Sequence, residues 1–281
     1  MDYLLFSKYD NRLRIGCKYY KHLKKVDMVK KISLSVAIIT KNEAENLPFC
    51  LSSVAFTDQI VIIDSGSTDK TKDIAQSFGC DFFLEDWKGF GRQKQSAIDK
   101  CKNEWVLVLD ADERIPPETA EEIIKIVNRN DLEAAGYSFK RKNFFQGRWI
   151  RHMGWWPDPV TRLFRKSRGH MSQSLVHESL IINGPVKALQ CCIDHHTESR
   201  LSRVLLKIDQ YSTLGAQQAY AEGKRSSAWG AGLRATLTFL QSYFLRLGIL
   251  DGAPGFTLSV TDAINKFFKY AKLSEIEKKE R

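Results

Sequence analysis

Asp110 and Asp112 stand one residue apart, directly after an apolar run, and this pair is the strongest candidate for chemistry in the chain. The run is WVLVL at 105–109, which is typical of a strand that is buried on both faces. Two carboxylates at a strand end can hold a divalent cation together, because Mg²⁺ and Mn²⁺ prefer oxygen ligands and often use substrate phosphates as well. A solvated acidic turn is the competing interpretation.

Asp64 ends a second apolar run, QIVIID at 59–64, and the turn-forming sequence SGS follows it. A carboxylate in this position can accept hydrogen bonds from a nucleobase or a ribose. The alternative is structural, since residues 67–69 can cap the next helix and favour its positive N-terminus. Both interpretations can hold together, because they use different residues.

Apolar runs alternate with helical patterns between residues 34 and 127. This alternation implies βα units, and therefore an α/β fold with a mostly parallel sheet and flanking helices. Ligands in such sheets bind at the carboxyl ends of the strands, where Asp64 and Asp110 are expected. The predicted strands are 34–39, 59–64, 81–84 and 105–109, and the predicted helices are 43–54, 69–78, 91–101 and 117–127.

The pattern changes after residue 136. A strand is predicted at 137–145, and helices are predicted at 199–221 and 233–250. The last helix carries an apolar stripe, which either packs on a core or lies in a membrane interface. We expect three parts: a basic N-terminal lead-in (1–31), an α/β domain (32–200) and a helical C-terminal region (201–281).

The composition narrows the class of partner. The 281 residues carry a formal net charge of +10, which favours anionic partners such as phosphate ligands or an anionic membrane surface. Much of the excess lies in the first thirty residues, and no RNA-binding or zinc-finger motif is present, so nucleic acid is not expected. Six cysteines without a C-x-x-C pair, and no signal sequence or long apolar run, indicate a cytoplasmic protein.

Four motifs in order resemble the inverting family 2 glycosyltransferases of the GT-A fold, a Rossmann-like nucleotide-diphospho-sugar transferase fold. They are VAIITKNEAENL, VIIDSGSTD, GRQKQSA and VLVLDADE, and the resemblance covers roughly 34–200. A narrower branch, the bacterial lipopolysaccharide-core β-1,4-glucosyltransferases, is similar in further stretches. These are WKGFGRQKQ, GWWPDPVTRLFR, VHE, KIDQYSTLGA and FLRLGILDGAPGF.

The resemblance implies roles on the donor side. Thr40 and Glu43 would contact the nucleotide, and Asp64 would hold its uracil or ribose. Lys94 stands where the family often has an arginine near the diphosphate. This keeps the positive charge but loses the bidentate fork.

The same resemblance implies a metal site that binds Mn²⁺ or Mg²⁺. Asp112 would be the direct metal ligand, and Asp110 would touch the ribose or the metal indirectly. In some GT-A enzymes a late histidine completes the site, and His196 is preferred over His195 for that role. A hydrogen-bonded structural histidine is the alternative for both.

The catalytic base departs from the family pattern, because the usual Glu-Asp pair is replaced by His177-Glu178. One carboxylate beside the acceptor is sufficient for an inverting transfer if its pKa is suitable. Glu178 is the preferred base and Asp158 is the alternative. His177 would be a structural neighbour or would orient Glu178.

Three further residues are candidates for substrate binding. Arg162 would meet a phosphate or the acceptor, or would pair with an acid. Trp155 and Trp156 would form a stacking platform for sugars, and burial in the core is the alternative for both.

The expected activity is a single displacement that moves a sugar from a nucleoside-diphosphate donor, UDP-glucose by resemblance, to a glycan or glycolipid acceptor. The implied acceptor is a lipopolysaccharide-core heptose or another lipid-linked glycan. The protein would reach it by attaching peripherally to the cytoplasmic face of the inner membrane. One alternative is a nucleotidylyltransferase, which usually shows a glycine-rich basic loop where this chain has TKNEAEN. The other is a non-catalytic glycan-binding protein, which would be expected to lose the D-x-D pair or the base.

Overall fold

The computed structural model describes residues 31–129, 133–172, 179–197 and 200–279. The chain forms two compact units. Of the described residues, those up to Lys140 and those within Pro159–Asp194 form the first unit. The described residues within Arg141–Asp158 and from His195 onward form the second unit. The domain boundaries expected from the sequence stay a prediction.

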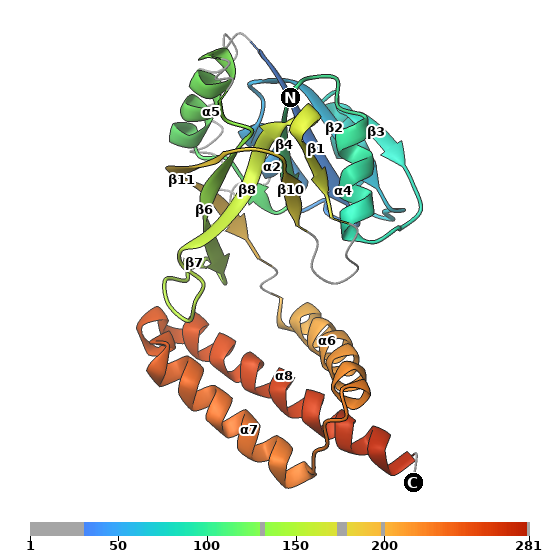
Figure 1. Ribbon diagram of the computed structural model, residues 1–281, viewed down its shortest axis with the longest axis vertical. Coiled ribbons are helices and arrows are strands. Elements are labelled where there is room, and N and C mark those ends of the chain that lie inside the picture. Colours follow the sequence, from blue (N-terminus) through green and yellow to red (C-terminus); the bar gives the residue numbers. More distant parts are fainter. Residues whose placement is uncertain (1–30, 130–132, 173–178, 198–199, 280–281) are drawn as a thin grey trace, which may run out of the picture. The chain divides into compact units, whose positions relative to one another are not determined.

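Four parallel strands form one half of the sheet in the first unit, in the order β3-β2-β1-β4 (Figure 1). Thr40 of β1 pairs in register with Asp64 of β2, and Ile39 pairs with Asp110 of β4. The carboxyl ends of the three strands therefore lie at one edge of the sheet. The strands are β1 (Ile32–Thr40), β2 (Thr57–Asp64), β3 (Asp81–Leu84) and β4 (Trp105–Asp110).

The other half of the sheet makes it a mixed sheet. β8 pairs antiparallel with β4, and the order continues β8-β6-β11-β5, with β7 paired to β6. β9 and β10 form a separate antiparallel pair. The bounds are β5 (Glu113–Arg114), β6 (Gly136–Phe145), β7 (Arg148–Trp149), β8 (Asp158–Arg165), β9 (Gly169–Met171), β10 (Leu180–Ile182) and β11 (Val186–His196).

Helices cover both faces of the parallel strands, because the strand residues are apolar on both sides. On β1, Leu34 and Ile38 belong to one apolar cluster and Ala37 belongs to the other. The first cluster includes residues of α2 and α5, and the second includes residues of α4. The elements are α2 (Leu47–Ser53), α3 (Thr71–Ser77), α4 (Phe90–Asp99), α5 (Pro117–Arg129) and the short η1 (Lys166–Arg168).

Three long helices dominate the second unit, and α8 runs alongside both α6 and α7 (Figure 1). The single helix predicted at 233–250 is wrong. The α-helix ends at Leu240, and the chain then reverses where Leu247 and Gly252 take φ values of 60° and 66°. The elements are α6 (Leu201–Ala221), α7 (Ala228–Leu240), π-helical η2 (Gln241–Leu245), η3 (Gly248–Asp251) and α8 (Gly252–Lys279).

Asp251 fixes this reversal within the second unit. Its carboxylate accepts hydrogen bonds from the backbone N–H groups of Arg151 and His152, at 3.1 and 3.0 Å. Within the described ranges, none of the helices is both long and apolar enough to cross a bilayer. The α/β class with flanking helices and a helical C-terminal extension is confirmed.

Candidate active site

The carboxylate of Asp64 organises the turn after β2. It accepts hydrogen bonds from Thr40 Oγ1 (2.7 Å) and from the backbone N–H groups of Gly66 (2.9 Å) and Ser67 (2.7 Å), and the Ser67 hydroxyl also donates to it. Only 2% of Asp64 is exposed. The residue thus shapes the loop at the strand end, while its direct contact with a nucleotide stays a prediction.

The loop after β1 is tied to the loop after β2. Lys41 Nζ donates to the carbonyl oxygens of Ser65 (2.6 Å) and Gly66 (2.8 Å), and the Glu43 N–H donates to Thr71 Oγ1 (2.9 Å). Thr40 and Glu43 therefore lie on loops joined by side-chain hydrogen bonds at the carboxyl ends of β1 and β2. Lys41, which lies between these two predicted residues, adds a cation there that the sequence pattern did not single out.

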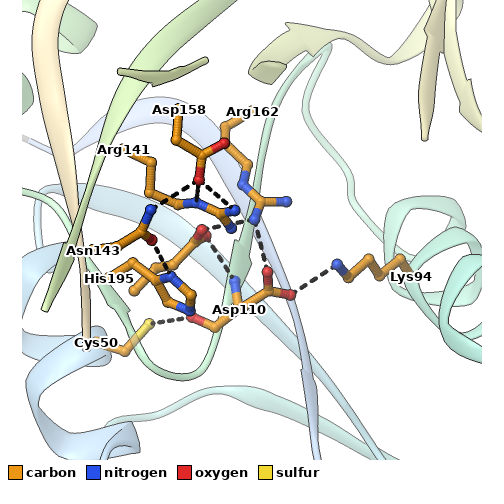
Figure 2. A network of polar contacts seen from close by, with 9 residues as sticks. Cys50, Lys94, Asp110, Arg141, Asn143, Asp158, Arg162 and His195 are labelled. Atoms are coloured by element: carbon orange, nitrogen blue, oxygen red, sulfur yellow. Dashed lines mark hydrogen bonds and ion pairs between the residues drawn. The ribbon is translucent and has the colours of Figure 1, made fainter. Parts of the chain in front are cut away.

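Two cationic side chains form ion pairs with the carboxylate of Asp110 at the end of β4 (Figure 2). Lys94 Nζ of α4 lies 2.8 Å from Oδ1, and Arg162 Nη2 of β8 lies 2.7 Å from Oδ2. Lys94 and Arg162 are both buried. The structure thus brings together three residues predicted separately, and of the alternatives for Arg162 it shows pairing with an acid.

Glu113 completes this buried group of charges. Its Oε1 lies 2.6 Å from Arg162 Nη2, and its Oε2 accepts the backbone N–H of Asp110 at 3.1 Å. Glu113 is fully buried. Burial alone would lower the pKa of Arg162, but the carboxylates of Glu113 and Asp110 outweigh it and hold that pKa above its ordinary value. The guanidinium therefore stays charged throughout the physiological range.

Asp112 suits a cation that arrives with a nucleotide. It lies half-buried in the turn after β4. Both oxygens of Asp110 face Lys94 and Arg162. Within the described ranges, no three Asp, Glu, His or Cys side chains gather as a metal-binding group. One carboxylate with phosphate oxygens is nevertheless a usual set for Mg²⁺, so the residues fit Mg²⁺ or Mn²⁺ bound together with a diphosphate.

A second polar cluster belongs to the second unit and centres on Asp158 (Figure 2). Its Oδ2 accepts from Arg141 Nε (2.8 Å) and Nη2 (2.7 Å) and from Asn143 Nδ2 (3.0 Å). Burial raises the pKa of Asp158, but the hydrogen bonds from Asn143 and Arg141 outweigh it and hold that pKa below its ordinary value. The preferred base, Glu178, and its neighbour His177 lie outside the described residues.

The two candidate histidines make structural contacts within the second unit. His195 Nδ1 lies 2.6 Å from Asn143 Oδ1, and the ring of His196 stacks on Phe144, with centroids 4.8 Å apart. The hydrogen bond of His195 matches the structural alternative. A role of His196 as a metal ligand stays a prediction.

The two tryptophans of the predicted platform pack edge-on against other aromatic rings. Trp155 meets Phe145, with centroids 6.5 Å apart, and Trp156 meets Trp149, with centroids 5.1 Å apart. Both are partly buried. Trp155 also lines a cavity of about 350 Å³ together with Tyr211 and polar groups of α8, a volume in the range of small-ligand sites.

Comparisons with known proteins agree on one family. Residues 35–185 match the model described as glycosyl transferase family 2. The lipopolysaccharide core biosynthesis glycosyltransferase LpsC of Rhizobium meliloti (strain 1021) is 32% identical, over 88% of this chain and 93% of LpsC. The uncharacterized glycosyltransferase RP128 of Rickettsia prowazekii (strain Madrid E) is 30% identical, over 89% of each chain.

Solved structures show only a distant likeness. The crystal structure of S. aureus TarS 1-349 gives a TM-score of 0.43 at 14% identity, over 88% of this chain and 92% of that chain. A likeness at this level says nothing about the ligands of the present chain.

Proposed function

We propose that this chain moves a sugar from UDP-glucose to a lipid-linked glycan. The premise is that the chain belongs to glycosyl transferase family 2 and has its GT-A fold. The group formed by Lys94, Asp110, Arg162 and Glu113, with Asp112 beside it, is the observation that carries the proposal. Membership of the family favours a transferase over the nucleotidylyltransferase and binding-protein alternatives. The relationship to LpsC, whose name states lipopolysaccharide core biosynthesis, supports an acceptor in the lipopolysaccharide core.

The donor would be held at the carboxyl ends of β1, β2 and β4. Thr40, Glu43 and the loop shaped by Asp64 would face the nucleoside, and Lys94 would contribute positive charge near the diphosphate. Because Lys94 and Arg162 hold both oxygens of Asp110, this carboxylate is fixed before the donor binds. Mg²⁺ or Mn²⁺ on Asp112 would supply charge neutralisation of the leaving diphosphate.

The reaction would be one displacement with inversion. A carboxylate takes the proton of the acceptor hydroxyl while the hydroxyl oxygen bonds to the anomeric carbon and the bond to the diphosphate breaks. Glu178 is our choice for this base. Asp158 is the less suitable candidate, because its hydrogen bonds to Arg141 and Asn143 favour its ionised form and lower its basicity.

The acceptor would be recognised by the second unit. Aromatic rings suit the apolar faces of sugars, and Trp155 borders a cavity that is also lined by polar groups. Trp156 and the candidate histidine His196 lie in the same unit. A lipid-linked acceptor places the enzyme on the cytoplasmic face of the inner membrane, as a peripheral protein.

The test is release of UDP from UDP-glucose in the presence of heptose-terminated lipopolysaccharide, with the product identified by mass spectrometry. We expect Glu178→Gln and Asp112→Asn each to reduce turnover by about 100-fold or more. Asp73→Asn, a change of the same kind on an exposed position of α3, serves as the matched control. Full turnover in Glu178→Gln would exclude this residue as the base. The proposal would be refuted if the enzyme transferred no sugar to any lipid-linked acceptor.

A further inference from the structure

An apolar surface lies exposed on α7 and η2 of the second unit. Trp229, Leu233, Leu237 and Leu240 recur at helical spacing and therefore share one face of α7, and Phe244 and Leu245 of η2 continue the series. The exposed fraction is 90% for Trp229, 63% for Leu233 and 80% for Leu245. We call these six residues the α7 surface. Soluble proteins rarely leave so many large apolar side chains exposed together without a binding partner.

An apolar groove between α7 and α8 extends this exposed region. It has a volume of about 400 Å³, and its walls include Phe239 of α7 together with Ile264 and Phe268 of α8. Phe239 also contacts Phe256 of α8, with centroids 5.8 Å apart. Phe256 and Phe268 are themselves exposed. Apolar side chains are therefore exposed on both helices that border the groove.

The chain segment that carries the α7 surface has charges of one sign, although Lys224 at its start pairs with Glu222 at 2.6 Å. Residues 223–250 contain Lys224, Arg225, Arg234 and Arg246 and no acidic residue, and all four basic side chains are exposed. An exposed tryptophan beside arginines and leucines is typical of a segment that lies in the headgroup region of a bilayer. Basic side chains there are attracted to anionic lipids.

We propose that the α7 surface inserts into the headgroup region of an anionic lipid bilayer, with α7 lying in the plane of the membrane. In-plane docking agrees with the finding that, in the part of the chain that the structure describes, no helix could span a bilayer. The inference rests on the proposed function in that the acceptor is lipid-linked, since an enzyme docked on the bilayer through the α7 surface can reach such an acceptor.

The test is sedimentation of the full chain with vesicles of phosphatidylcholine, alone or mixed with phosphatidylglycerol. We expect binding to the anionic vesicles, weaker binding to the neutral ones, and loss of binding as salt rises. The affinity of the triple variant Trp229→Ala/Leu233→Gln/Leu237→Gln for the anionic vesicles should be lower by about tenfold or more. Leu84→Gln, which changes a leucine of β3 that is 70% exposed, should bind as the wild type does.

Two further measurements distinguish loss of membrane binding from loss of folding and from self-association. Circular dichroism and UDP titration of the triple variant should match the wild type, so that lost vesicle binding is not lost folding. Vesicle binding equal to wild type in the triple variant would overturn the proposal. Self-association that the triple variant abolishes, without vesicle binding by either protein, would identify a second copy as the occupant and would also overturn it. Failure to bind UDP with vesicle binding intact would count against the proposed function alone.

Discussion

Replacing Arg162 by methionine removes a cation that Glu113 and Asp110 share, while Lys94 still faces Asp110. Arg162 Nη2 makes two short ion pairs, at 2.7 Å to Asp110 and 2.6 Å to Glu113. Glu113 has no exposed surface. Breaking a buried pair from one side typically costs about 3–5 kcal/mol, because an uncompensated charge remains. We therefore expect Arg162→Met to destabilise the first unit by about that amount.

Hydrogen exchange of peptides from β4 and β8, read by mass spectrometry, measures this change where it occurs. A loss of about 3 kcal/mol corresponds to exchange roughly 100-fold faster in amides that exchange by unfolding of the unit. Arg168→Met provides the matched control, because Arg168 is exposed in the neighbouring η1, and a surface change there should stay within about 0.5 kcal/mol.

A double-mutant cycle with Glu113→Gln tests the reason for the loss. If the cost arises because the buried carboxylate of Glu113 loses the charge of Arg162, Glu113→Gln in the Arg162→Met background should recover about 1–3 kcal/mol. Arg162→Met within about 1 kcal/mol of wild type, or a double variant that recovers nothing, would refute the assignment of this group as a coupled ion-pair network.

Two further changes test electrostatics and close packing. The hydrogen bond from Ser96, with help from neighbouring lysines, lowers the pKa of Glu85 to about 2. Because the folded pKa lies below the unfolded one, the stabilisation is present above pH of about 4.5 and is lost as the pH falls through about 2. Glu85→Gln should therefore cost about 1 kcal/mol at pH 7 and progressively less as the pH is lowered toward 2 in denaturant titrations, and a pH-independent difference would contradict this cause. A Cβ on Gly255 would overlap the carbonyl oxygen of Gly248, so Gly255→Ala should lower the melting temperature. The control Gly232→Ala has open space around it and should raise the stability by up to about 1 kcal/mol. Equal effects of the two substitutions on the melting temperature would show that α8 does not pack as described.

The parallel half of the sheet was predictable because its physics is local. The runs at 34–39, 59–64 and 105–109 are apolar on both faces, and β1, β2 and β4 contain them. The following acids then fall at one edge of the sheet, as the pairing of Thr40 with Asp64 shows. These elements needed no knowledge of distant contacts.

The antiparallel half and the buried charges depend on distant partners. Arg162 meets Asp110 across 52 residues of chain, and Glu113 looks like an ordinary surface acid in the sequence. The one available signal was its position three residues after Asp110, directly after the turn that contains Asp112. The reversal after α7 escaped prediction because the apolar pattern continues to residue 250, while the break rests on the backbone of Leu247 and Gly252.

The most direct measurement of the central claim is calorimetric titration of UDP, GDP, CMP and ADP, with and without Mn²⁺, into the wild type and Asp112→Asn. The proposed donor site predicts UDP binding that requires Mn²⁺ and disappears in the variant. Preference for another nucleotide would leave the transferase chemistry intact and show that the donor is wrong. No binding of any nucleotide under either condition would contradict the assignment of this strand edge as a nucleotide-sugar site.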